Sequence, residues 1–163
     1  MTRIGHIVVT AAFAILAACA GSLPEIPADL AAELGEIVVE APLQNTAPGW
    51  AISGTARLVA VPRFPIMQVQ VEAAGLTPGP HGWHIHSGGC RNPGAVVVAL
   101  SAIGDQPGID EPIVAGADGT AAEDAVVPAS SLTEAQVRAG EYSLHIHNTA
   151  GADPGRSIAC AEL

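Results

Sequence analysis

The chain has 163 residues, which is enough for one ordinary domain and too few for two. Six arginines and no lysine stand against sixteen acidic residues, so the net charge is −10. This balance argues against binding to nucleic acids or attraction to anionic lipid surfaces, because both need a basic surface. Nearly half of the residues are apolar, and glycine and proline are abundant. The composition therefore favours a well-buried core made of strands and turns over a helical bundle.

The first eighteen residues have the pattern of an export signal. Arg3 is followed by an apolar stretch over residues 7–18, which has the length of a signal-peptide core and is short for a membrane span. It ends in Leu-Ala-Ala-Cys at residues 16–19, which resembles the lipobox of bacterial lipoproteins. In that class the chain is cut before the cysteine and the thiol is acylated, so Cys19 is the expected lipid anchor.

This resemblance implies a division of the chain and a location. We expect a signal peptide over residues 1–18, a lipid-anchored tether over 19–35 and one domain over 36–163. The mature protein would lie in the cell envelope, on its periplasmic side. Ala20 is not aspartate, which implies sorting to the outer membrane if the cell is Gram-negative.

Two cysteines remain once Cys19 is assigned to the anchor. An even pair in an exported protein predicts a single disulfide, here between Cys90 and Cys160; two buried free thiols are the alternative, which an oxidising compartment disfavours. The bond would close a loop of 70 residues, for which the chain-entropy model gives at most about 4 kcal/mol of stabilisation.

The body of the chain is predicted to consist of short strands. Residues 67–72 alternate strictly between apolar and polar, and Asp118-Gly119 is a strong hairpin signal. A capping-box spacing over residues 131–134 and a glycine at position 140 predict one short helix over 132–138. The expected strands cover residues 37–39, 50–61, 67–72, 81–87, 95–100, 113–114, 120–127, 141–148 and 158–162. This pattern predicts an all-β fold, a Greek-key β-sandwich or flattened eight-stranded barrel with one short helix.

Two His-x-His pairs carry the chemistry. His84 and His86 share one face of their predicted strand, and His145 and His147 share one face of theirs, because side chains two apart on a strand point the same way. Two such strands side by side would gather up to four imidazoles. Imidazole suits copper, zinc, iron or nickel, and a tetragonal set of nitrogens favours Cu(II). A satisfied core histidine is the ordinary explanation of a single histidine, but it fits two such pairs poorly.

The residues around these pairs resemble the copper/zinc superoxide dismutases. Residues 75–86 are similar to the turn and strand that present two copper ligands in that family, with Trp83 as the aromatic between the histidines. Residues 114–120 resemble a family hairpin, residues 144–147 the strand with a third copper histidine, and residues 157–160 the C-terminal strand with its disulfide cysteine. The resemblance runs from about residue 37 to 163.

The resemblance implies roles for individual residues. His84, His86 and His147 would bind copper, and Cys90 would bond Cys160. His81 matches a family position that braces the ligand strand by hydrogen bonds, and Trp83 is expected to pack in the core. The family places an arginine three residues before the last cysteine, where this chain has Ser157. Arg156, one residue earlier, is the candidate catalytic arginine. A β-bulge could bring its side chain to the site, although strand alternation alone would turn it away.

The departures from the family concern zinc and the fourth copper ligand. No histidine occurs between Cys90 and His145, so the bridging and zinc-binding histidines are missing and no zinc is expected. His145 stands where the family usually has an apolar residue. It could be a fourth copper ligand or a neighbour that binds no metal, and the sequence leaves both open.

Three functions follow from this pattern. The first is a copper-dependent superoxide dismutase-like lipoprotein without zinc, acting on superoxide; the second is a non-catalytic copper-binding lipoprotein that exchanges copper with a donor or acceptor protein. The third is a metal-free adhesion or scaffold module. Membrane contact is expected through the lipid anchor only. Loss of Arg3 leaves a mature net charge of −11, which repels superoxide at long range, with Arg91 and Arg156 as local attractors.

Overall fold

The structure is a computed structural model that describes residues 35–100, 111–150 and 155–163. The predicted signal peptide, the lipobox and the tether as far as residue 34 lie outside the described residues. The first strand begins at Glu36. No helix in the described ranges has the length and apolar character needed to cross a bilayer.

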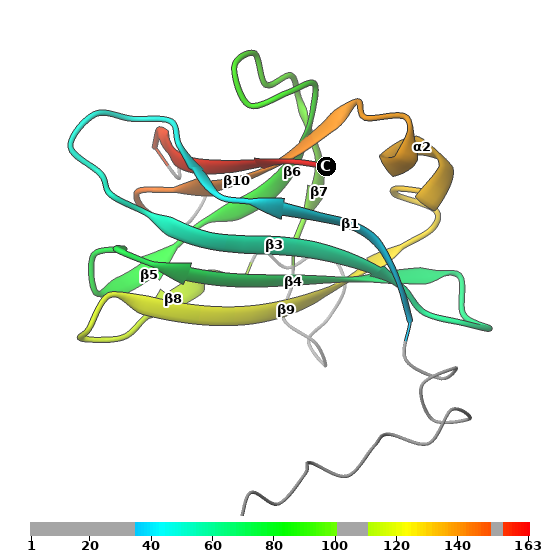
Figure 1. Cartoon of the computed structure of the whole chain (residues 1–163), viewed down its shortest axis with the longest axis horizontal. Coiled ribbons are helices and arrows are strands. Elements are labelled where there is room, and N and C mark those ends of the chain that lie inside the picture. The colour runs from blue at the N-terminus through cyan, green and yellow to red at the C-terminus, as the bar shows by residue number, and fades with distance from the viewer. Residues whose placement is uncertain (1–34, 101–110, 151–154) are drawn as a thin grey trace, which may run out of the picture.

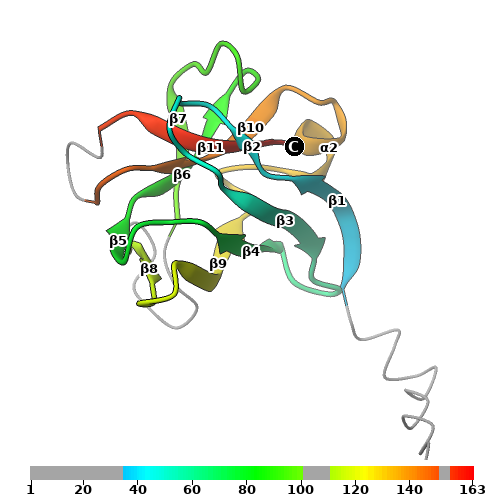
Figure 2. The ribbon, with the colours of Figure 1, turned by 60° about the vertical axis from the view of Figure 1, so that its left-hand side comes forward.

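Two antiparallel sheets form the body of the molecule, as a β-sandwich (Figures 1 and 2). The first sheet has the order β1 (Glu36–Pro42), β3 (Ser53–Ala60), β4 (Ile66–Ala74) and β9 (Thr120–Pro128). The second has the order β2 (Gln44–Asn45), β11 (Ser157–Glu162), β10 (Tyr142–His147), β6 (Trp83–Ser87) and β7 (Val96–Ala99). A separate pair joins β5 (Gly79–His81) to β8 (Ile113–Ala115). Neighbours such as β6 and β10 are not consecutive in the chain, as Greek-key connections require.

The predicted strands occur, although their ends move by up to three residues: the strand expected over 50–61 is β3, which starts at Ser53, and the one expected over 37–39 is β1, which extends to Pro42. Two differences are larger. The strand expected over residues 81–87 is divided at Gly82, whose N–H donates to the Thr149 carbonyl and whose carbonyl accepts from the His147 N–H. These bonds turn the backbone away from β5 and into β6. The two-residue strand β2 was not predicted, since Gln44 and Asn45 carry no strand pattern and are held only by pairing with β11.

The predicted helix exists but starts later. Helix α2 covers Glu134–Arg138, and its N-cap is Thr133, not Ser131. The Thr133 side chain accepts from the Gln136 N–H while the Gln136 side chain accepts from the Thr133 N–H, which is a complete capping box. Gly140, with φ of 73°, follows the helix.

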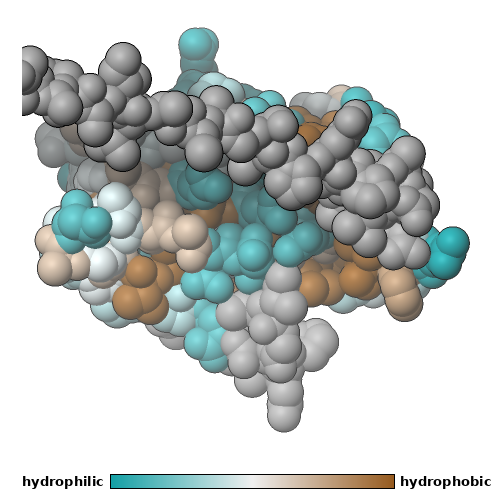
Figure 3. Space-filling view, turned by 60° about the horizontal axis from the view of Figure 1, so that its bottom comes forward, coloured by the Kyte–Doolittle hydropathy of each residue, from teal (hydrophilic) through white to brown (hydrophobic). Residues whose placement is uncertain are grey.

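The core lies between the two sheets and follows the alternation in the sequence. On β4 the side chains of Met67, Val69 and Val71 are buried, while the glutamines between them are only half-buried. The outside of the molecule is mixed. Where the described surface is visible in Figure 3, apolar (brown) residues form separate spots among hydrophilic (teal) ones.

Candidate metal centre

The histidines lie on the outer face of the second sheet because the residues between them fill the core. Trp83 and Ile85 on β6, and Leu144 and Ile146 on β10, are fully buried. Ile85 pairs with Leu144 in the register of the two strands, so both point into the sandwich. The alternate residues must therefore point outward, on the other face of the same strand pair.

The two His-x-His strands are neighbours, as the sequence predicted. His84 lies directly opposite His145, and the ring centroids of His84 and His147 are 5.2 Å apart. The centroids of His86 and His147 are 5.9 Å apart. His84, His86 and His147 each offer one ring nitrogen, and these three atoms all lie within 4.8 Å of one another. The structure thus brings together the three predicted copper ligands.

Backbone carbonyls orient two of these rings. His86 Nδ1 donates to the Gly94 carbonyl oxygen at 3.0 Å, and His147 Nδ1 donates to the Gly155 carbonyl oxygen at 3.1 Å. A carbonyl at Nδ1 fixes the tautomer that leaves a lone pair on Nε2 for a metal. His86 Nε2 is buried and has no hydrogen-bond partner in the described structure. A buried nitrogen in that state costs free energy unless something binds it.

The donor set fits a copper ion. Metal–nitrogen bonds of about 2 Å require bound nitrogens to lie at most about 4 Å apart, so small rotations of the imidazoles close the present set. Three neutral imidazoles suit copper and also other divalent transition metals. The described residues therefore form a candidate centre for a transition-metal ion.

His145 lies beside this centre but outside it. Its ring centroid is 4.8 Å from that of His86, yet its two nitrogens have other partners: Nε2 is 3.0 Å from Ser143 Oγ and Nδ1 is 2.8 Å from Ser157 Oγ. Ser143 Oγ also donates to the Gly88 carbonyl oxygen at 2.8 Å, so it accepts from His145 Nε2. The Ser157 hydroxyl then donates to the other nitrogen, Nδ1. Of the two alternatives that the sequence left open, this arrangement favours a neighbour over a fourth ligand.

The charge state of His145 agrees with this arrangement. Burial, followed by the proximity of His86, His147 and His84, lowers the pKa of His145 from 6.5 to about 4. The ring is therefore neutral at pH 7 and has a single lone pair, which a serine hydroxyl engages.

His81 and Trp83 support the site from inside the fold. His81 Nδ1 donates to the His147 carbonyl oxygen at 2.8 Å, and its Nε2 lies 2.9 Å from the Thr77 carbonyl oxygen. His81 thus braces the strand that carries His147, in the role that the resemblance implied. The Trp83 indole is fully buried, and its N–H donates to the Glu111 carbonyl oxygen at 2.9 Å.

The predicted disulfide between Cys90 and Cys160 is present. It ties the segment after β6 to β11, and Cys160 Sγ lies 3.2 Å from His145 Nε2. The Cys90 N–H also donates to Glu162 Oε1 at 3.0 Å. This segment includes Gly94, so the disulfide restrains the loop that supplies the carbonyl partner of His86.

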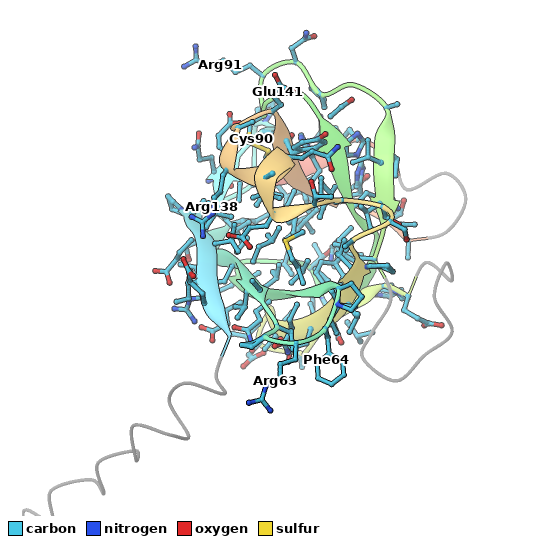
Figure 4. All side chains as sticks on the ribbon, turned by 90° about the vertical axis from the view of Figure 1, so that its right-hand side faces the viewer. Arg63, Phe64, Cys90, Arg91, Arg138 and Glu141 are labelled. Carbon is cyan, nitrogen blue, oxygen red and sulfur yellow. A yellow bond between two sulfur atoms is a disulfide. The ribbon has the colours of Figure 1, made fainter. Side chains whose placement is uncertain are left out.

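The two candidate arginines lie at exposed positions. The pairing of β10 with β11 shifts register between Ile146 and His147, which is the kind of irregularity that the sequence allowed near Arg156. The Arg156 carbonyl accepts from the Asn148 N–H, and its side chain is exposed. Arg91 projects away from the body of the molecule (Figure 4). A role for either arginine in attracting an anion stays a prediction.

Sequence reasoning missed the groups that orient the histidines. The partners of His86 and His147 are backbone carbonyls of Gly94 and Gly155, and a carbonyl has no signature in a sequence. The glycine at position 94 is a weak sequence signal of this close packing, since a Cβ there would lie 2.4 Å from Ser87 Oγ.

Comparison with known proteins supports the fold. No family model matches the chain, and no curated protein matches it. Among solved structures, the clock protein EA4 is similar, with a TM-score of 0.56 and 17% sequence identity. The match covers 76% of this chain and 90% of that one. At this identity the likeness concerns the fold alone.

Proposed function

We propose that this chain is a copper-binding, superoxide dismutase-like lipoprotein of the cell envelope, which converts superoxide to oxygen and hydrogen peroxide without zinc. The observation that carries the proposal is the convergence of His84, His86 and His147 from two neighbouring strands, with His86 Nε2 buried and unpartnered. The lipobox resemblance supports the location, and the motif resemblance at residues 75–86 supports the reaction.

The residues of the chain have distinct tasks in this proposal. His84, His86 and His147 hold the ion, and the carbonyls of Gly94 and Gly155 hold two of the rings in the binding tautomer. Bound copper would supply one-electron exchange between Cu(II) and Cu(I), which dismutation of superoxide requires. His145 has both nitrogens engaged by serines, so the protons must come from solvent.

The non-catalytic copper-binding function is the second candidate, and the charge of the protein favours it. A mature net charge of −11 repels the superoxide anion, and salt screens that repulsion only beyond about 10 Å at 0.1 M. A copper carrier does not need a surface that attracts an anion. The missing bridging histidine points the same way, since the chain lacks the family's fourth nitrogen ligand.

One preparation tests both functions. The exported protein is loaded with Cu(II), its metals are counted, and superoxide decay is measured per bound copper, with His86→Ala as the variant and Ile37→Ala, at an exposed position on β1, as a control outside the site. Dismutation that scales with bound copper supports the enzyme. Tight copper binding with decay no faster than that of the metal-free protein supports the carrier, and failure to bind copper contradicts both.

A further inference from the structure

The turn between β3 and β4 displays an exposed aromatic residue. The Phe64 side chain is 64% exposed, the largest value among the large apolar residues that the structure describes. The Phe64 N–H donates to the Val61 carbonyl oxygen at 3.2 Å, which closes a tight turn around Pro62. Arg63 has a φ of 68°, in the region that favours glycine, so the turn carries a long cationic side chain where a glycine would fit without strain.

A recess of about 390 Å³ lies at the base of this turn, with both apolar and polar groups in its lining. Its lining includes Val61, Ile66, Met67 and Leu132, together with Phe64. Two acids, Glu36 and Glu134, stand at the recess. Both are bonded by the same guanidinium: Arg138 Nη2 is 2.8 Å from Glu36 Oε1 and Arg138 Nε is 2.7 Å from Glu134 Oε1. The single positive charge of Arg138 therefore compensates one of these two negative charges.

This turn lies where the tether meets the domain. Glu36 pairs with Ala60, the last residue of β3, so β1 begins beside the base of the turn. In Figure 4, Arg63 and Phe64 project from the end of the molecule at which β1 begins. Gly35 follows the expected anchor Cys19 by sixteen positions, which is a span of at most about 55 Å. The bilayer that holds the anchor is thus within reach of the turn.

We propose that the turn over residues 62–65 docks onto the anchoring membrane, with the Phe64 ring in the interfacial region and Arg63 at the lipid phosphates. The proposal rests on the lipid anchor, and it replaces the expectation of contact through the lipid alone. Aromatic residues prefer this interface, and arginine binds phosphate through paired N–H donors. A weak contact suffices because the tether holds the turn near the bilayer at a high effective concentration.

Such docking would orient the domain. Strand β4 begins next to the turn and runs for nine residues, about 30 Å, to Ala74. Ala74 and Val114 line a recess at the far end of that strand, and Figure 1 shows β5 and β8 at the opposite end of the sandwich from the turn. The start of β6, with His84, follows β5, so docking by the turn leaves that end of the molecule away from the bilayer.

Tryptophan substitution tests the contact at a single residue. Phe64→Trp and Val114→Trp form a matched pair, since the native side chains are 64% and 63% exposed. Each purified lipoprotein is reconstituted into phosphatidylcholine vesicles with and without brominated acyl chains, and the signal of the native Trp50 and Trp83 is subtracted. We expect F64W to show a blue-shifted emission and a loss of fluorescence with brominated lipid, and V114W to show neither change.

Each other result overturns the proposal. Equal quenching of both variants means that the domain lies flat on the bilayer, and absence of quenching in both means that the turn does not touch it. Self-association of the wild type that Phe64→Ser abolishes assigns the turn to a second copy of the chain. A purified protein without lipid on Cys19 removes the premise. Failure of the copper proposal is separate, because His86→Ala should leave the quenching of F64W unchanged.

Discussion

Replacing His145 by valine tests whether His145 is a copper ligand or only a neighbour of the copper site. Valine has nearly the volume of histidine and suits a strand, so the substitution leaves little cavity. It removes the bonds between His145 and the hydroxyls of Ser143 and Ser157. The Ser143 hydroxyl keeps its bond to the Gly88 carbonyl oxygen at 2.8 Å, and the Ser157 hydroxyl is then free to donate to the Ala159 carbonyl oxygen, which lies 3.2 Å away. With two hydrogen bonds lost at about 1 kcal/mol each, the free energy of unfolding should fall by about 2 kcal/mol.

The effect on copper should be smaller than the effect of losing a ligand. Loss of an outer-shell partner typically lowers metal affinity 10–100-fold, and His145 has only a ring contact with His86, so we expect a decrease of at most about 10-fold for His145→Val. His86→Ala removes a nitrogen of the donor set and should lower affinity more than 100-fold, above the range for outer-shell partners.

Competition with a chelator measures the two affinities, and electron paramagnetic resonance of the Cu(II) protein counts the bound nitrogens. The nitrogen count should be the same in the wild type and in H145V and should fall by one in H86A. A nitrogen lost from the spectrum of H145V, together with an affinity as low as that of H86A, would refute the reasoning. That result would mean that His145 gives up its hydrogen bonds to Ser143 and Ser157 and binds the copper ion.

Three further outcomes can be measured. Replacing Cys90 and Cys160 together by serine should lower the free energy of unfolding by up to about 4 kcal/mol in denaturant, and an unchanged midpoint would contradict the chain-entropy argument. Gly94→Ala should weaken copper binding about 10–100-fold, because a Cβ there lies 2.4 Å from Ser87 Oγ and displaces the carbonyl that orients a ligand. Adding Ser87→Ala should restore part of the affinity, and equal affinities in all three proteins would exclude the mechanism. Hydrogen bonds from Thr120 lower the pKa of Asp118 below 3.8, so Asp118→Asn should destabilise the protein above that pH, and the difference should vanish as the pH falls through the folded pKa.

The sequence predicted the parts of the site that depend on alternation. Trp83, Ile85, Leu144 and Ile146 had to face the core, and this placed the intervening histidines together on the outer face once β6 and β10 paired. The sequence could not decide the role of His145, because a shared face permits both ligation and a hydrogen bond to a neighbour. That choice depends on Ser157, which lies on the adjacent strand and bonds to its ring.

His145 and Ser157 are linked departures from the resembling family. The family usually has an apolar residue at the first position and an arginine at the second, and here the two positions bond to each other at 2.8 Å. A residue-by-residue comparison treats them as separate losses. The hydrogen bonds of the His145 ring show that they form one polar group beside the metal centre, together with Ser143.

The start of helix α2 and strand β2 show a second limit of prediction from local sequence patterns. Ser131 and Thr133 both have hydroxyls that can cap a helix, and only the reciprocal bond between Thr133 and Gln136 selects the second. Strand β2 exists because β11 offers it an unpaired edge, which is a tertiary effect without local pattern. Local signals therefore predicted which elements occur, and contacts between elements set their ends.

The rate of superoxide decay per bound copper tests the proposed function most directly. We predict one copper per chain, no stoichiometric zinc, and a decay rate that rises in proportion to bound copper in the wild type and is lost in His86→Ala. A fully copper-loaded wild type that removes superoxide no faster than His86→Ala would contradict the dismutase proposal and leave copper binding alone as the function of the three histidines.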